Sequence, residues 1–161
     1  MLGAKTPTIF SFGCGIALDY LCAVEVFGND VKYYGIDECD WTIKETAAYK
    51  NFEPKLPKTI KFDSGRFLLN LDYENLVICF FNSLFTISNN TDLEEVLIEA
   101  LENKHDFYII CNCTINNNYH MPKEEQDFID NLTKALSKDF RFKSFEILDG
   151  KGIIVYGSKI S

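Results

Sequence analysis

Two glycines and one carboxylate form a pattern in this sequence that is suited to binding a ligand. Gly13 and Gly15 lie in the stretch FSFGCGIALDY, residues 10–20, and Asp37 ends the next apolar run. Glycine lets the backbone bend sharply and approach a ligand that a side chain would push away. A carboxylate can accept hydrogen bonds from both hydroxyls of a ribose. The pattern predicts a loop that binds a nucleotide-like ligand, and a plain structural turn is the alternative.

Apolar runs alternate with helix-period stretches along most of the chain. Runs typical of buried strands cover residues 6–12, 31–37, 59–63, 75–81 and 106–113. Helix-period stretches cover residues 17–27, 41–52, 92–104 and 122–140, with a short helical turn near 65–71. Residues 141–160 read as two strands around a turn signal at Asp149–Gly152, which predicts an antiparallel hairpin. We therefore expect an α/β fold with a doubly wound, three-layer sheet whose last strand runs against the others.

The glycine loop and Asp37 are expected at the ligand-binding edge of this sheet. In doubly wound sheets, ligands bind beyond the carboxyl ends of the strands, where the strand order reverses. A dinucleotide fingerprint would place a further small residue at position 18, but Leu18 stands there. We expect this leucine to hold the helix away from a pyrophosphate, which disfavours NAD and FAD. The sequence also lacks a GxxxxGK[ST] loop for a nucleoside triphosphate.

Four segments resemble, in order, the class I S-adenosylmethionine-dependent methyltransferases. SFGCGIA is similar to the glycine-rich first motif, YYGID to the ribose-binding acid, KFDSG to the acidic residue after strand three, and LVICFFNSLF to the strand-four motif. The resemblance covers essentially the whole chain, residues 1–161, as a single domain. It implies a seven-stranded, mostly parallel sheet with an antiparallel hairpin strand, and S-adenosyl-L-methionine (SAM) as the cofactor.

The resemblance also implies a role for each matched residue. Gly13 and Gly15 would border the methionine part of SAM, and Asp37 would hold the ribose hydroxyls. The other candidate cofactor-binding residues are Ser11, Cys14, Glu38, Asp63, Ser64 and Asn82. Asp63 with Ser64 would lie near the adenine edge, although Asp63 could instead cap the helical turn that follows. Ser11 stands where the family has an acid, so the methionine ammonium would lose a charge partner there, and Ala17 replaces the third glycine.

The candidate catalytic residues are Asn82, Tyr119 and His120, after the fourth and fifth strands. His120 could serve as a general base because its unperturbed pKa lies near neutrality, and a surface histidine beside a helix start is the alternative. The methyl acceptor could be a small molecule, RNA or a protein. DNA is not expected, because NSLF lacks the Pro-Pro-aromatic sequence with which amino-methylating DNA enzymes hold their base.

Composition excludes several classes of protein. The 161 residues are 47% hydrophobic, enough for a real core. The net charge of −8 gives little support for binding nucleic acid by electrostatics alone, although a local basic patch is compatible with it. No run of about 18 apolar residues is present, and we expect a cytoplasmic protein without membrane contact. The six cysteines form no CxxC pair and no zinc-ligand spacing with the two histidines, so we expect reduced structural thiols and no metal.

Two functions from different classes follow. The first is a SAM-dependent methyltransferase of unidentified substrate. The second is a non-catalytic methyltransferase-like module that binds a protein partner. Two features suggest it: Ser11 in place of an acid, and the short segment before the first strand. With so short a segment, the substrate or a partner chain would have to cover the site. An open pocket lined by Gly13, Gly15 and Asp37 favours the enzyme. A third candidate function, an NAD-dependent oxidoreductase, is compatible with the sequence only if the Leu18 side chain points away from the contact between helix and strand.

Overall fold

The computed structural model describes residues 6–15, 17–37, 60–61, 75–81, 91–102, 104–112, 123–147 and 152–161. The strands are β1 Thr8–Phe12, β2 Lys32–Asp37, β3 Ile60–Lys61, β4 Leu76–Phe81, β5 Phe107–Asn112, β6 Phe140–Ile147 and β7 Gly152–Lys159. The described helices are α1 Leu18–Phe27, α3 Thr91–Glu102 and α4 Lys123–Leu136. The helices predicted over 41–52 and near 65–71 lie outside the described residues.

The strands form one mixed sheet in the order β3-β2-β1-β4-β5-β7-β6. Strands β1 to β5 are parallel, and β7 runs antiparallel to both β5 and β6. The described part of β3 has two residues, whereas the other six strands have five to eight. The predicted doubly wound sheet, with one antiparallel strand in a terminal hairpin, is confirmed.

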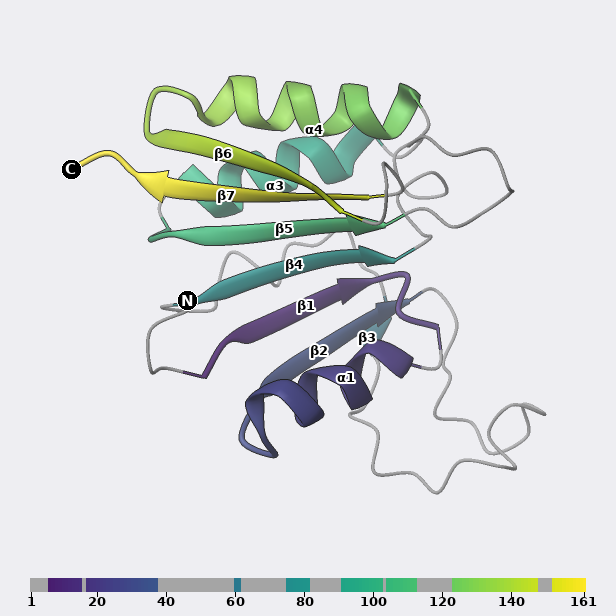
Figure 1. Cartoon of the computed structure of the whole chain (residues 1–161). Coiled ribbons are helices and arrows are strands. Elements are labelled where there is room, and N and C mark those ends of the chain that lie inside the picture. The colour runs from purple at the N-terminus through teal and green to yellow at the C-terminus, as the bar shows by residue number, and fades with distance from the viewer. Residues whose placement is uncertain are drawn as a thin grey trace.

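Helices on both faces explain why the central strands are apolar on both sides. All five residues of β1 and five of the six residues of β4 are buried. One cluster of buried side chains packs β1, β4 and β5 against α3 and α4, and a second, smaller cluster packs the opposite face of the sheet against α1. Figure 1 shows α1 in front of the sheet and α3 behind it. A strand covered on both faces needs apolar residues at every position, which is why the sequence runs were continuous rather than alternating.

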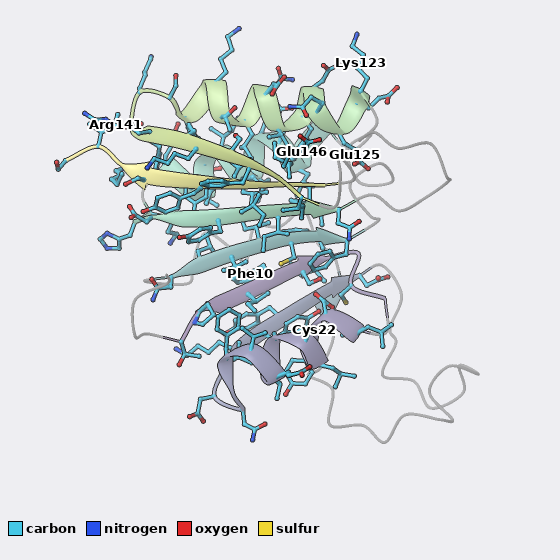
Figure 2. The ribbon with its side chains drawn as sticks, viewed as in Figure 1. Phe10, Cys22, Lys123, Glu125, Arg141 and Glu146 are labelled. Atoms are coloured by element: carbon cyan, nitrogen blue, oxygen red, sulfur yellow. The ribbon has the colours of Figure 1, made fainter. Side chains whose placement is uncertain are left out.

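Helix α4 buries one stripe of side chains at helical spacing: Glu125, Phe128, Ile129, Leu132 and Leu136. Figure 2 shows Glu125 between the helix and the sheet, and Lys123 pointing away. The predicted extension of this helix to residue 140 is wrong, because α4 ends at Leu136 and Phe140 is the first residue of β6. Phe140 is 2% exposed and packs edge-on against Phe107, with ring centroids 5.0 Å apart, so tertiary packing overrides the local helical pattern.

A glycine on β7 makes room for the aromatic cluster that joins β5 to the hairpin. Gly157 is in register with Phe107 on one side and with Phe142 on the other. A Cβ atom built on Gly157 would lie 2.7 to 3.1 Å from three atoms of the Phe107 ring. Since Phe107 is fully buried, its ring has no open space into which it could move.

We therefore expect Gly157→Ala to lower the free energy of unfolding by about 1 to 3 kcal/mol through overpacking. The same substitution in a Phe107→Leu background should cost much less, because leucine lacks the ring atoms that the new methyl group would meet. Urea unfolding of the four members of this cycle measures the coupling. Equal costs in both backgrounds would show that the contact with Phe107 is not the cause.

Candidate active site

The loop between β1 and α1 is a tight turn held in a left-handed backbone conformation. Gly13, Gly15 and Ala17 have φ angles of 64°, 53° and 55°. The amides of Gly13 and Cys14 both donate to the Ile36 carbonyl of β2, at 2.7 and 3.2 Å. At Gly15 a Cβ atom would meet no atom within 4 Å, so open space lies beside the backbone there. Glycine suits this conformation, and the loop leaves backbone accessible to a ligand.

Asp37 at the end of β2 is bonded to the same loop. The Gly15 amide donates to Asp37 Oδ2 at 2.9 Å, and Asp37 is the last residue of β2. This bond lies at the carboxyl ends of β1 and β2, next to the point between β1 and β4 where the strand order reverses. The structure therefore brings together the two features that the sequence singled out.

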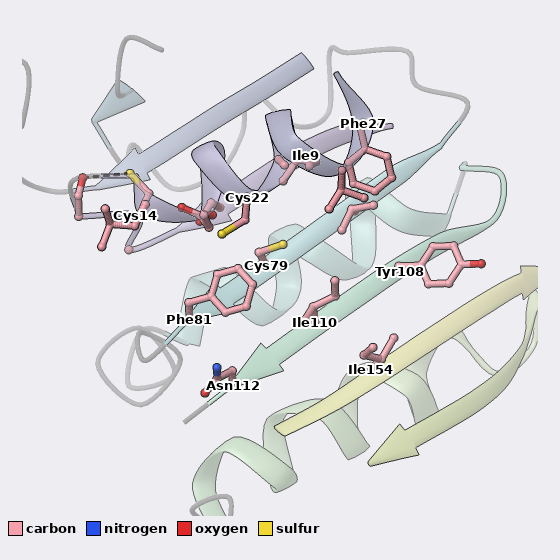
Figure 3. Close-up of a pocket in the computed structure, with 18 residues that line it drawn as sticks. Ile9, Cys14, Cys22, Phe27, Cys79, Phe81, Tyr108, Ile110, Asn112 and Ile154 are labelled. Atoms are coloured by element: carbon pink, nitrogen blue, oxygen red, sulfur yellow. Dashed lines mark hydrogen bonds between the residues drawn. The ribbon is translucent and has the colours of Figure 1, made fainter. Parts of the chain in front are cut away.

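A cavity of about 870 Å³ opens beside the loop, on the α1 face of the sheet. Its floor is built from cross-strand neighbours: Ser11, Cys79, Ile110 and Ile154 form one row across β1, β4, β5 and β7. Its side wall is α1, which contributes Leu18, Asp19, Cys22, Ala23, Val26 and Phe27. Figure 3 shows Cys14 and Cys22 at one side of the cavity and Ile154 at the other. The lining is mostly apolar, with a few polar groups near the loop, as in many small-molecule sites.

The predicted cofactor-binding residues fall into three groups. Ser11, Gly13, Cys14 and Gly15 line the cavity. Asp37 is bonded to Gly15 but is not among the lining residues. The remaining predicted site residues, Glu38, Asp63, Ser64, Asn82, Tyr119 and His120, lie outside the described residues.

The expectation that Leu18 would hold the helix away from a pyrophosphate placed this side chain at the contact between helix and strand, and it does not lie there. Leu18 is 52% exposed and lines the cavity, whereas Ala17 and Ala23 are the buried residues of segment 17–27. The left-handed conformation of Ala17, directly before the helix, sets which side chains of α1 face the sheet. Leu18 therefore gives no steric argument against a dinucleotide.

Three buried oxygen atoms that line the cavity have no hydrogen-bond partner among the described residues: Ser11 Oγ, Asp19 Oδ2 and Asn112 Oδ1. A buried polar atom without a partner is costly, and it marks a place where a ligand or water would bind. Sequence reasoning missed Asp19 and Asn112. The available signal was position: Asn112 is the polar end of an apolar strand, and Asp19 is the acid in the first turn of the helix after the glycine loop.

Cys14, Cys79 and Cys111 are held as thiols by their surroundings. Burial, then the nearby charges of Asp37 and Asp19, raise the pKa of Cys14 to about 12. Burial also raises the pKa values of Cys79 and Cys111 well above the ordinary value. The described cysteines are all free, and the described residues contain no cluster of three or more metal-ligating side chains.

We expect iodoacetamide at pH 8 to alkylate the exposed Cys22 at least about 100-fold faster than Cys14, since the thiolate is the nucleophile and forms at Cys14 only near its raised pKa. Peptide mass spectrometry over time measures both rates in one sample, and urea-unfolded protein is the control in which the two rates converge. Equal rates in the folded protein would contradict the buried, negatively charged surroundings of Cys14.

In the part of the chain that the structure describes, none of the helices combines the length and apolar character that crossing a membrane requires.

Comparison with known proteins shows similarity in structure only. A scan against models of protein families finds no match, and neither does a search of curated protein sequences. Among solved structures, a SAM-dependent methyltransferase from Aquifex aeolicus is similar with a TM-score of 0.55 at 16% identity, over 95% of this chain and 82% of that one. The 16S rRNA methylase ArmA is similar with a TM-score of 0.54 at 15% identity, over 98% of this chain and 76% of that one.

A third similar structure was solved with its cofactor. Magnesium protoporphyrin IX methyltransferase (ChlM) from Synechocystis PCC 6803, with bound SAM, has a TM-score of 0.54 at 10% identity, over 98% of this chain and 72% of that one. All three similarities extend over at least 95% of this chain, so they cover the whole sheet, including the antiparallel β7. The chain has the fold of the class I S-adenosylmethionine-dependent methyltransferases.

Proposed function

We propose that this protein is a SAM-dependent methyltransferase whose cofactor binds at the loop between β1 and α1. The main support for the proposal is the hydrogen bond from the Gly15 amide to Asp37, beside the cavity. This bond links the glycine loop, which is suited to the methionine part of SAM, to the carboxylate that is suited to the ribose of SAM. The fold of three methyltransferase neighbours, one of them with bound SAM, supports this assignment.

The residues present fit the cofactor. The positive φ angles of Gly13 and Gly15 turn the loop, and the open space beside Gly15 leaves room for a ligand against the backbone. Asp37 already accepts one bond from Gly15, but a carboxylate has about four acceptor positions, so it can also accept from ribose hydroxyls. The cavity volume of about 870 Å³ lies within the range of small-molecule sites, roughly 300 to 1,000 Å³.

When bound, SAM supplies a methyl group made electrophilic by its positive sulfonium. The loop and Asp37 orient the ligand, and the apolar walls formed by Cys79, Phe81 and Ile110 exclude water from it. Catalysis of this kind depends mainly on proximity and alignment, and a general base is needed only when the acceptor must lose a proton. Asn82, Tyr119 and His120 remain the proposed catalytic residues, because they follow the carboxyl ends of β4 and β5.

On this proposal the protein acts in the cytoplasm on a methyl acceptor that is a small molecule, an RNA or a protein, and the acceptor or a partner chain covers the site. A non-catalytic module is not favoured, because Gly13 and Gly15 line an open cavity rather than one filled by side chains. An NAD-dependent oxidoreductase is disfavoured by topology: dinucleotide-binding sheets have the order 3-2-1-4-5-6, whereas here the antiparallel β7 lies between β5 and β6.

Isothermal titration calorimetry with SAM, S-adenosylhomocysteine, NAD and ATP tests the proposal. The first two should bind, and NAD and ATP should give no binding heat. Protein shown to be folded by circular dichroism that gives no heat with SAM or S-adenosylhomocysteine would overturn the proposal. Binding of NAD alone would instead support the oxidoreductase.

A further inference from the structure

The polar end of the cavity contains two oxygen acceptors for which the described residues supply no hydrogen-bond donor. Ser11 on β1 is 1% exposed, and its hydroxyl makes no hydrogen bond of ordinary geometry with a described residue. Asp19, in the first turn of α1, has one carboxylate oxygen, Oδ2, that is equally buried and equally unpartnered. Both residues line the cavity beside Gly13 and Gly15.

Tyr33 fixes the position of the Asp19 carboxylate. Its hydroxyl donates to Asp19 Oδ1 at 2.8 Å, and its ring packs against Tyr20 with centroids 5.2 Å apart. Burial first, and then the charge of Asp19, raise the pKa of Tyr33, while the neighbouring Ser11 hydroxyl acts in the opposite direction. Tyr33 therefore stays a proton donor to Asp19, and the side chains of Ser11 and Asp19 flank the same phenol.

The charges around this end of the cavity are negative. None of the described residues that line the cavity is a lysine, arginine or histidine. The charge of Asp19 contributes to the raised pKa values of both Cys14 and Cys79, so it acts on the loop and on the cavity floor. A buried carboxylate oxygen with no donor is costly until a cation approaches it.

We propose that Asp19, assisted by the Ser11 hydroxyl, binds a primary ammonium group, which on the proposed function is the amino group of the methionine part of SAM. A carboxylate on α1 thus takes the place of the acid missing from β1. An ammonium carries three N–H donors, which suits two unsatisfied acceptors on neighbouring elements. A sulfonium carries no N–H donor and would leave both oxygens unsatisfied.

The test compares Asp19→Asn and Ser11→Ala with Glu25→Gln, which removes an exposed carboxylate from the same helix away from the cavity. Asparagine keeps an oxygen for Tyr33 but loses the charge. Three probes are titrated by calorimetry: SAM, S-adenosylhomocysteine, which keeps the ammonium but lacks the sulfonium, and 5′-methylthioadenosine, which lacks the amino-acid end altogether.

We expect Asp19→Asn to weaken both SAM and S-adenosylhomocysteine about 10- to 100-fold, and Ser11→Ala to weaken them about 3- to 10-fold. Affinity for 5′-methylthioadenosine should stay within about 2-fold in every variant, as should all three affinities in Glu25→Gln. The melting temperature of ligand-free Asp19→Asn should stay within about 3 °C, because losing a helix-terminal charge and removing an unpaired buried charge act in opposite directions.

Each other pattern overturns the inference. Weaker binding of SAM alone would place Asp19 at the sulfonium. Equal weakening of all three probes would show that Asp19 only holds the loop in place, and unchanged affinities would remove it from the site. If the wild-type protein binds none of the probes, the proposed function fails and this inference fails with it, whereas wild-type binding that Asp19→Asn leaves intact rejects this inference alone.

Discussion

Asp37→Ala should weaken SAM binding about 30- to 1,000-fold, which corresponds to about 2 to 4 kcal/mol. Two bonds from ribose hydroxyls to a charged acceptor are each worth roughly 1.5 to 3 kcal/mol, and their sum is reduced because water replaces part of the carboxylate. The substitution also removes the acceptor of the Gly15 amide, at a partly buried position. That loss should lower the free energy of unfolding by only about 1 kcal/mol.

Two further variants separate the roles of Asp37. Asp37→Asn keeps an oxygen for the Gly15 amide but loses the charge, so its affinity should lie between those of the wild type and Asp37→Ala. Asp30→Asn, at an exposed position after α1, should leave affinity unchanged. Calorimetry gives the affinities, and urea unfolding gives the stabilities. If Asp37→Ala greatly lowers the free energy of unfolding but leaves the affinity for SAM unchanged, then Asp37 only stabilises the turn and does not bind the cofactor.

Phe107→Ala should have the largest effect on stability, a loss of about 3 to 5 kcal/mol in the free energy of unfolding. Phe107 is fully buried on β5 and packs against Phe140 and Phe142, with ring centroids 5.0 and 6.2 Å away. Its removal leaves a cavity opposite Gly157, a residue with no side chain to fill it. A small domain has about 5 to 15 kcal/mol of stability in total, so the variant should be close to unfolding at 37 °C.

Phe145→Ala is the matched control for this prediction. Phe145 is on the neighbouring strand β6 but is 53% exposed, so its removal should cost less than about 1 kcal/mol. Urea unfolding of both variants, with the same probe, gives the comparison. If both variants lose a similar free energy of unfolding, then the aromatic contacts of Phe107 between β5 and the hairpin do not contribute to stability as a buried core would.

The order and type of the helices and strands could be predicted from the sequence. The central strands are covered by helices on both faces, so their residues are apolar at nearly every position and stand out as continuous apolar runs. TIFSF and LVICFF are such runs, and they became β1 and β4. The end of α4 could not be predicted locally, since the residues after Leu136 continue a helical pattern. Packing of Phe140 against Phe107, across 33 positions of sequence from 107 to 140, decides that boundary.

The meeting of the glycine loop with Asp37 was predictable because parallel strands place their carboxyl ends at one edge of the sheet. The orientation of α1 was not. It depends on the left-handed backbone of Ala17, a conformation that is uncommon for alanine and leaves no mark in the sequence pattern. That orientation turns Leu18 toward the cavity mouth and brings Asp19 to Tyr33, which is why one expectation failed and one candidate residue was missed.

A crystal structure of the protein grown with S-adenosylhomocysteine would show directly whether the cofactor binds at the loop between β1 and α1. We predict ligand density in the cavity beside β1 and α1, with the amino-acid end against the Gly13–Gly15 loop and both ribose hydroxyls within about 3.2 Å of the Asp37 carboxylate. Density for the ligand at any other place, with the Gly15 amide and Asp37 making no contact to it, would contradict the assignment of this loop as the cofactor site.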